Sequence, residues 1–216
     1  MSTLRNTPRA LAIGVAALAV SVTLSGCISL FPKSNPSGLY RFGHDAAAAS
    51  TTPTEKSFGV FKTPTVFTRA AASDRLLSVT NGEAAYIADA RWVSPATVLF
   101  DEAVARAFEA DNSRARLVTR GETVKADMAL RLEVRSFETD YVNGPKAPPE
   151  VLVEVRAVLT RSNDRALLGD KIFVARVKTA DNRLAAIVPA YDQANGQVLS
   201  QVVDWVSEAG AKLPKG

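Results

Sequence analysis

Three consecutive segments in the second half of the chain alternate between apolar and polar residues, and this alternation constrains the fold more than any other feature. The segments span residues 126–142, 150–161 and 167–180. Successive side chains of a β-strand point to opposite faces, so a period of two predicts strands with one buried face and one wet face. The alternating apolar positions are Met128, Leu130, Leu132 and Val134; Val151, Val153, Val155, Ala157 and Leu159; and Phe173, Ala175 and Val177.

The connections between these segments are rich in residues that favour turns. The first connection reads VNGPKAPPE and the second reads SNDRA. Asparagine, glycine, proline, serine and aspartate each favour turn conformations. We therefore predict that the three strands form an antiparallel meander. Shorter strands are predicted at 38–42, 59–70, 75–80, 83–93 and 115–119. Pro64 argues for an edge position or a bend within the second of these.

Two further segments show the spacing of three and four that is typical of amphipathic helices. The first has Ser94 as its cap, Pro95 at its first position and a stripe formed by Phe100, Val104 and Phe108. The second has Pro189 in its first turn and ends near Gly210. Its stripe comprises Tyr191, Ala194, Val198, Val202 and Val206. The apolar face of the sheet is the surface available to cover both stripes. The prediction is an α/β (α+β) fold, with a mainly antiparallel sheet and two main helices on one face.

The start of the chain has the organisation of a secretory signal peptide. Residues 1–9 contain Arg5 and Arg9 and no acidic residue, and residues 10–24 are almost entirely apolar. A short basic segment, an apolar stretch of about 7–15 residues and then small residues make up the signal-peptide pattern. A membrane-spanning helix needs about 20 apolar residues, so a permanent span is the weaker alternative.

Cys27, the only cysteine, follows this segment directly. Leu24-Ser25-Gly26-Cys27 resembles the bacterial lipobox. The resemblance implies diacylglyceryl transfer to the Cys27 sulfur, cleavage between Gly26 and Cys27, and acylation of the new amino terminus. The alternative is that Cys27 is a small buried filler, as free cysteine commonly is. A disulfide within one chain is excluded because there is no second thiol.

Cleavage at this point divides the chain into a signal peptide (1–26), a lipidated tether (27–37) and a single domain (38–212). The 190 residues from Cys27 onward are enough for one domain with a substantial core. Without Arg5 and Arg9, 24 of the 26 basic residues remain against 22 acidic ones. No basic cluster longer than two residues occurs, so nucleic-acid binding lacks its electrostatic footprint.

The sequence offers little material for catalysis or for metal binding. His44 is the only histidine, which excludes a histidine-based metal cluster and leaves any catalytic triad dependent on one residue. Nucleotide-binding loops and the G-x-S-x-G motif are absent. Asp101 and Glu102 are adjacent carboxylates, which we expect to complement the dipole of the first helix. We therefore expect no catalytic residue, no metal and no cofactor except the lipid on Cys27.

Arg91 and Trp92 form the one pair that the sequence marks for a contact role. The simpler interpretation is that Trp92 packs against the first helix. The alternative is a contact with a partner protein or with lipid, because tryptophan and arginine are enriched at interfaces.

Taken together, several segments resemble the ABC-type transport auxiliary lipoproteins, which include the paraquat-inducible protein C type. The resemblance rests on the signal and lipobox, LYRF, the segment AYIADARWVSPATVLFDEAVARAFEA, the meander and the terminal helix. Its most specific part is ARWVSP leading into the helix at 95–110. An alanine- and threonine-rich insertion at 46–54 departs from the family pattern.

The resemblance implies a non-catalytic role in a lipid-transport system of Gram-negative envelopes. Its partners would be an MCE-domain protein and an ABC permease and ATPase, and homo-oligomerisation stays open. Ile28, rather than aspartate, after the cysteine points to an anchor in the outer membrane, facing the periplasm. The alternative is a structural lipoprotein of envelope assembly, such as a tethered plug or chaperone.

The lipobox interpretation predicts the behaviour of a Cys27→Ala variant. Wild-type protein should fractionate with membranes and incorporate a radiolabelled fatty acid. The variant should lose both properties, because the thiol that accepts the diacylglyceryl group is gone. A variant that still sediments with membranes, or a label attached elsewhere in the wild type, would contradict lipidation at Cys27.

Overall fold

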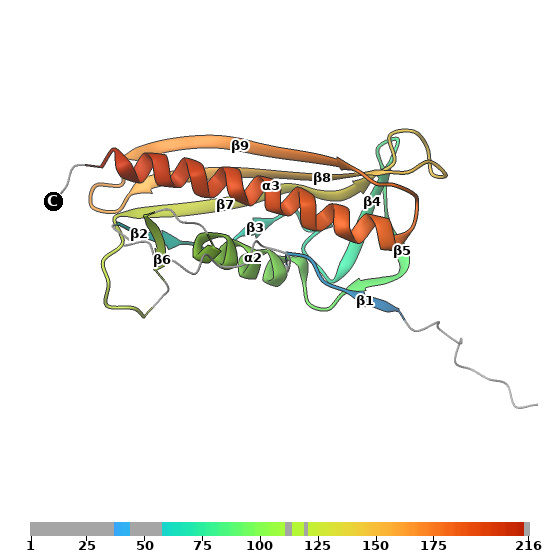
Figure 1. The fold of residues 1–216 in the computed structure, drawn as a ribbon, viewed down its shortest axis with the longest axis horizontal. Coiled ribbons are helices and arrows are strands. Elements are labelled where there is room, and N and C mark those ends of the chain that lie inside the picture. The colour runs from blue at the N-terminus through green and yellow to red at the C-terminus, as the bar shows by residue number, and fades with distance from the viewer. Residues whose placement is uncertain (1–36, 44–57, 111–113, 119–120, 214–216) are drawn as a thin grey trace, which may run out of the picture. The chain divides into compact units, whose positions relative to one another are not determined.

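The computed structural model describes residues 37–43, 58–110, 114–118 and 121–213, which contain nine strands and two helices (Figure 1). All of these residues belong to one compact unit that begins at Pro36. The strands are β1 (Gly38–Tyr40), β2 (Phe58–Lys62), β3 (Val66–Phe67), β4 (Arg75–Thr80), β5 (Glu83–Trp92), β6 (Ala115–Val118), β7 (Met128–Asp140), β8 (Glu150–Arg161) and β9 (Leu167–Lys178). The helices are α2 (Ala96–Ala110) and α3 (Leu184–Ala211).

The three long strands form the antiparallel meander that the alternation predicted. β7 pairs with β8, and β8 pairs with β9, along almost their whole lengths. A β-bulge lies between Val134 and Ser136 and inserts one residue into β7. Because of this extra residue, Phe137 and Thr139 are buried on the same face as Val134 although the spacing is odd. The bulge therefore keeps the whole length of β7 in register with the core.

The other edge of β7 is covered by three short strands in succession. β2 pairs with the start of β7, β3 with its middle and β4 with its end, and all three run parallel to it. The break between β2 and β3 contains Pro64, which confirms the bend expected there, because proline has no N–H to donate to a ladder. β5 pairs with β4 in antiparallel and with β1 in parallel orientation, and β6 runs parallel to β2. The longest ladders are antiparallel, as expected, and the sheet as a whole is mixed.

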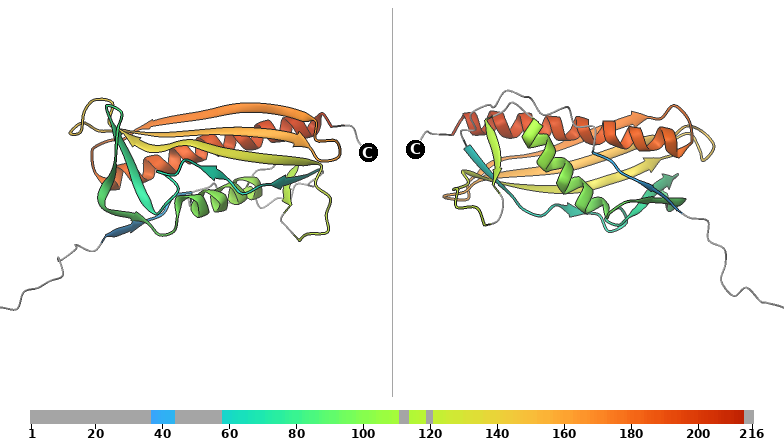
Figure 2. Two further views of the ribbon diagram at one scale, coloured as in Figure 1. Left: turned by 180° about the vertical axis from the view of Figure 1, so that it is seen from behind. Right: turned by 60° about the horizontal axis from the view of Figure 1, so that its bottom comes forward.

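Both helices lie on one face of the sheet (Figures 1 and 2). α2 begins one residue after Pro95, within the usual uncertainty of a helix boundary. α3 begins at Leu184, so Pro189 lies inside the helix and not in its first turn as predicted. The missing N–H of Pro189 leaves the carbonyl of Ala185 without its helical partner, and Ala185 is exposed, so water can reach it. Neither helix is long and apolar enough to cross a membrane.

Four aromatic rings join the sheet to α3 at the centre of the core. The ring of Trp92 lies 4.9 Å from that of Phe42 and 5.1 Å from that of Tyr191, both edge-on, and Phe137 lies 4.9 Å from Tyr191. Such edge-to-face contacts add about 0.5–1.5 kcal/mol per pair beyond burial. The hydroxyls of Tyr191 and Thr139 are 3.1 Å apart, and burial raises the pKa of Tyr191 above its ordinary range.

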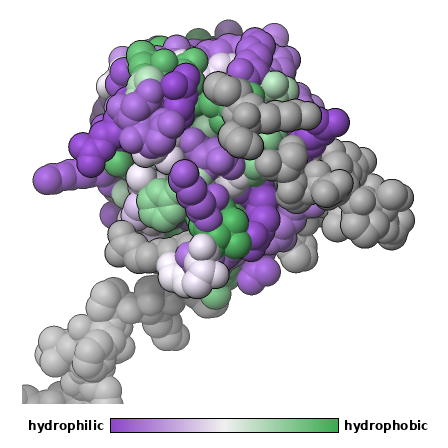
Figure 3. Space-filling model, turned by 90° about the vertical axis from the view of Figure 1, so that its left-hand side faces the viewer, coloured by the Kyte–Doolittle hydropathy of each residue, from purple (hydrophilic) through white to green (hydrophobic). Residues whose placement is uncertain are grey.

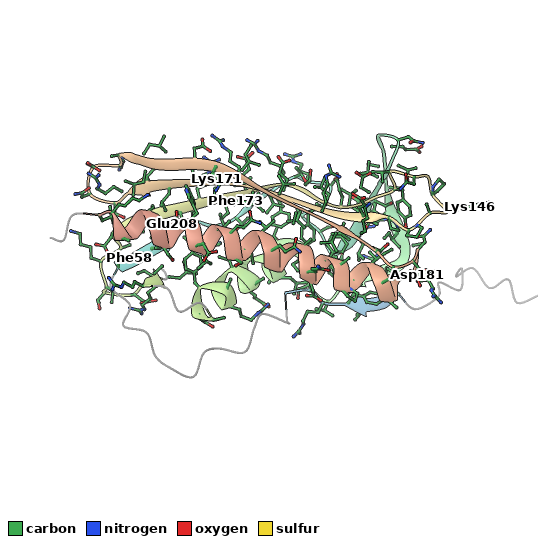
Figure 4. All side chains as sticks on the ribbon, turned by 45° about the horizontal axis from the view of Figure 1, so that its top comes forward. Phe58, Lys146, Lys171, Phe173, Asp181 and Glu208 are labelled. Carbon is green, nitrogen blue, oxygen red and sulfur yellow. The ribbon has the colours of Figure 1, made fainter. Side chains whose placement is uncertain are left out.

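At its C-terminal end α3 packs on β9 and β2 through aromatic side chains. Phe173 and Trp205 meet edge-on at 5.7 Å. The Lys171 ammonium lies 4.9 Å from the Phe173 ring, and both of these residues are labelled in Figure 4. A side chain at Gly169 would come within 2.6 Å of Trp205, so this strand position requires glycine. Seen from this end, the surface shows several small hydrophobic patches separated by hydrophilic side chains (Figure 3).

The face of the meander opposite the helices is not covered by a helix (Figure 2). Charged side chains on this face form ion pairs between neighbouring strands. Arg156 on β8 bonds both carboxylate oxygens of Asp170 on β9, at 2.9 and 2.5 Å. These hydrogen bonds hold the pKa of Asp170 below its ordinary value. Glu133 on β7 lies 3.6 Å from the same guanidinium. These ion pairs lie at polar positions of the alternation, but β9 also exposes the apolar side chains of Ile172 and Val174.

Two glycines of α3 predict opposite effects of the same substitution. A Cβ at Gly196 would meet no atom within 4 Å, whereas a Cβ at Gly210 would lie 2.3 Å from the Phe58 ring. Gly196→Ala should stabilise the protein by about 0.5–1 kcal/mol, because alanine is the better helix former. Gly210→Ala should destabilise it by about 1–3 kcal/mol, because the Phe58 ring must move.

Thermal and urea denaturation of the full-length protein in mild detergent measure both effects. Each variant is the control of the other, since helix propensity favours alanine at both positions. A stabilising Gly210→Ala, or a destabilising Gly196→Ala, would contradict the packing described for α3.

Candidate functional site

A groove of about 510 Å³ runs between α2 and α3, and we call it the interhelix groove. It exists because the facing positions of the two helices carry small residues. On α2 these are alanines, and on α3 a glycine and a serine lie opposite them. The small residues are Ala103, Ala107, Ala110, Gly196 and Ser200. Sites for small molecules usually have volumes of about 300–1,000 Å³, so the groove is of the size that a ligand can occupy.

The floor of the groove belongs to the hydrophobic core. Leu199 and Val203 line it and are 3% and 2% exposed. Both residues lie on α3 beside the stripe that covers the sheet, and both belong to the buried residues of the helix. The floor is therefore apolar and held in place by the core. Asp204, the last α3 residue that lines the groove, is exposed. An apolar floor with polar ends suits an elongated ligand that has one polar terminus.

Gly43 closes one end of the groove by bridging the two helices. Its N–H donates to the Asp192 carboxylate at 2.5 Å, and its carbonyl accepts from Arg106 Nε at 2.9 Å. The backbone of Gly43 has φ of 72°, and an added Cβ would lie 2.7 Å from that of Ala103. Both the left-handed conformation and the close approach require glycine here.

Two polar atoms at this same end are buried without a hydrogen-bond partner. They are Arg106 Nη2 on α2 and Asn195 Oδ1 on α3, and Asn195 is only 1% exposed. A buried polar group that lacks a partner destabilises the folded state by about 1–3 kcal/mol. Arg106 also lies 3.6 Å from Glu102 on its own helix. Asn195 lines the groove, whereas Arg106 lies next to it. Both side chains adjoin Gly43, because a Cβ there would lie 3.4 Å from Asn195 Nδ2 and 3.6 Å from Arg106 Nη2.

The comparisons with known proteins bear on the whole domain. The sequence model of the ABC-type transport auxiliary lipoprotein component matches residues 40–203. The chain belongs to this family. The auxiliary lipoprotein is accordingly a component of an ABC-type transport system, which implies a cell-envelope location and association with a transporter. The family resemblance of the sequence is confirmed.

Solved structures show the same fold. Protein XCC0632 from Xanthomonas campestris is 25% identical, with a TM-score of 0.69 over 82% of this chain and 98% of that one. The hypothetical protein CT253 from Chlamydia trachomatis is 12% identical, with a TM-score of 0.50 over 71% of this chain and 97% of that one. No curated protein matches the auxiliary lipoprotein significantly.

The structure places Arg91 and Trp92 on opposite sides of β5, as neighbours in a strand must be. Trp92 is 2% exposed and lies in the aromatic cluster, where its ring meets Tyr191 of α3 and not a ring of α2. The exposed Arg91 guanidinium pairs with Asp74 at 2.8 Å. The two residues therefore do not form a joint surface in the auxiliary lipoprotein. Gly26, Cys27 and His44 lie outside the described residues, so the statements about them stay predictions.

Asp101 and Glu102 do not occupy the first turn of α2, which contains no acidic residue. The expected complement to the helix dipole is therefore wrong. Asp101 instead accepts from Lys62 Nζ at 2.6 Å and from the Thr65 hydroxyl, so it ties α2 to the segment around β2. Glu102 pairs with Arg106 one turn later.

Sequence reasoning missed the interhelix groove because small residues on a helix do not reveal what faces them. One signal was present: Asn195 and Gly196 interrupt the apolar pattern of α3 between the buried stripe positions Ala194 and Val198. A buried asparagine beside a glycine that packing does not require is unusual in a helix whose other buried residues are mostly apolar.

Truncation of Trp92 and of Arg91 should separate a packing role from a surface role. Trp92→Ala should lower the free energy of unfolding by about 3–5 kcal/mol, because a large buried ring is lost. Arg91→Gln should lower it by less than about 1 kcal/mol, because exposed ion pairs contribute little. Denaturant titration of the full-length protein measures both values. Equal stability of the two variants would place Trp92 at the surface and contradict its position in the core.

Proposed function

We propose that this chain is a non-catalytic, lipid-anchored accessory component of an ABC/MCE-type lipid transport system between the inner and outer membranes. The observation that carries the proposal is the family match over residues 40–203, which covers all but the ends of the domain. The apolar floor of the interhelix groove supports lipid as the transported class, because it offers a surface of the matching polarity.

The anchor supports a location in the envelope. Three acyl chains on Cys27 would hold the protein permanently, since one chain alone binds a membrane only reversibly. Ile28 after the cysteine supports the inner leaflet of the outer membrane, with the domain in the periplasm. From there the domain would meet the other components of the system through its folded surface.

The partners proposed are an MCE-domain protein and the ABC permease with its ATPase. The sequence has no Walker A loop, so ATP hydrolysis would belong to the ATPase partner. Self-association of the auxiliary lipoprotein is part of the same proposal. The domain would then act by holding partners or lipid, with no bond made or broken in the lipid.

Co-purification of the lipidated full-length protein tests this function. The protein is extracted from its own envelope in mild detergent after brief crosslinking, and bound proteins and lipids are identified by mass spectrometry. The expected partners are an MCE-domain protein and the permease, both reduced for the Cys27→Ala variant because it no longer reaches the membrane. Recovery of outer-membrane barrel proteins with no transporter component would overturn the proposal in favour of an envelope-assembly role.

A further inference from the structure

We propose that the interhelix groove binds one acyl chain of a zwitterionic phospholipid, with the headgroup at the end closed by Gly43. This inference rests on the proposed function, since it names the lipid class and the site. It follows from three observations: the apolar floor, the length of the groove, and the unpartnered polar atoms of Asn195, which lines the groove, and of Arg106, which adjoins Gly43.

The dimensions of the groove suit a single chain. The residues of α3 that line it extend from Pro189 to Asp204. At a rise of 1.5 Å per residue this stretch is about 22 Å long. The hydrocarbon core of a bilayer is about 30 Å thick, so an acyl chain in one leaflet spans about 15 Å. One chain therefore fits along the groove, with room left for a headgroup at the closed end.

The closed end offers the chemistry that a zwitterionic headgroup needs. Arg106 Nη2 is a charged donor without a partner, which suits a phosphate oxygen. Asn195 Oδ1 is an acceptor without a partner, which suits an ammonium or hydroxyl group. Glu102 lies 3.6 Å from the Arg106 guanidinium, and Asp192 accepts from the N–H of Gly43, whose carbonyl accepts from Arg106. A purely anionic headgroup would therefore meet negative charge at this end of the groove. A headgroup that carries both charges matches this arrangement.

Photo-crosslinking in vesicles tests the site with the full-length lipidated protein. The protein is reconstituted into vesicles of phosphatidylethanolamine and phosphatidylglycerol that contain a trace of phosphatidylethanolamine with a diazirine on its acyl chain. After irradiation, mass spectrometry of the digest locates the adducts. The expected adducts lie on peptides of α2 and α3 that line the groove.

Gly196 provides the blocking variant, because it lines the groove and a Cβ added there would meet no atom within 4 Å. Gly196→Trp should reduce groove adducts by at least about tenfold, since the indole takes the space of the chain. Gly196→Leu is the milder second variant in case the indole perturbs folding. Gln201→Trp is the matched control: Gln201 is exposed on the same helix and does not line the groove. It should leave labelling unchanged.

Headgroup recognition has its own readout. Arg106→Gln should reduce labelling by the phosphatidylethanolamine probe about tenfold, because a charged hydrogen bond is lost. The same diazirine on phosphatidylglycerol should label the wild type more weakly than the phosphatidylethanolamine probe does. Equal or stronger labelling by phosphatidylglycerol would overturn the zwitterionic assignment.

The outcomes separate this inference from the proposed function. If transporter components co-purify but the adducts lie outside the groove, or Gly196→Trp and Gln201→Trp label alike, the groove assignment is overturned and the accessory role stands. If the groove is labelled as expected while no transporter component co-purifies, the lipid site stands and the transport role fails.

Discussion

The whole domain depends on the two edges of β7. One edge carries the long antiparallel ladder to β8 and β9, and the other edge carries β2, β3 and β4 in parallel. β7 therefore joins the N-terminal and C-terminal halves of the chain into one sheet. The bulge after Val134 is part of this arrangement, because it keeps Phe137 on the face that receives α3. Without that shift the second half of β7 would turn its apolar residues to water.

The groove follows from the way this sheet is covered. α3 lies along β8 and β9, and its stripe fills the space above them. α2 packs mainly against α3 and β6. The boundary between the two helices therefore lies at the outer surface of the helical layer. Small residues on both sides leave that boundary unfilled, and Gly43 seals one end by bonding to both helices. An opening of this kind needs no distortion of the core beneath it.

The local sequence pattern predicted those helices and strands that a single segment specifies by itself. It did not predict which distant segments pair with one another in the sheet. The meander followed from a period of two, and α2 from its spacing and Pro95. The parallel pairing of β2, β3 and β4 with β7 did not follow from the sequence, because the sequence of a short strand does not indicate its direction in the sheet. Pro189 was predicted to lie in the first turn of α3, but the helix begins earlier, at Leu184. The exposed first turns of the helix tolerate a missing N–H. The interhelix groove depends on residues that face each other across two helices. A single sequence does not show which residues of the two helices face each other.

Asn195 and Gly196 make the strongest argument that the groove is more than a packing defect. Glycine inside a helix is less favourable than alanine by about 1 kcal/mol, and a Cβ at Gly196 would meet no atom within 4 Å. Its neighbour Asn195 buries an acceptor without a partner, which destabilises by about 1–3 kcal/mol more. Stability alone would favour a different residue at each position. Two such departures side by side, both facing the same opening, are the pattern that a binding site leaves in a fold.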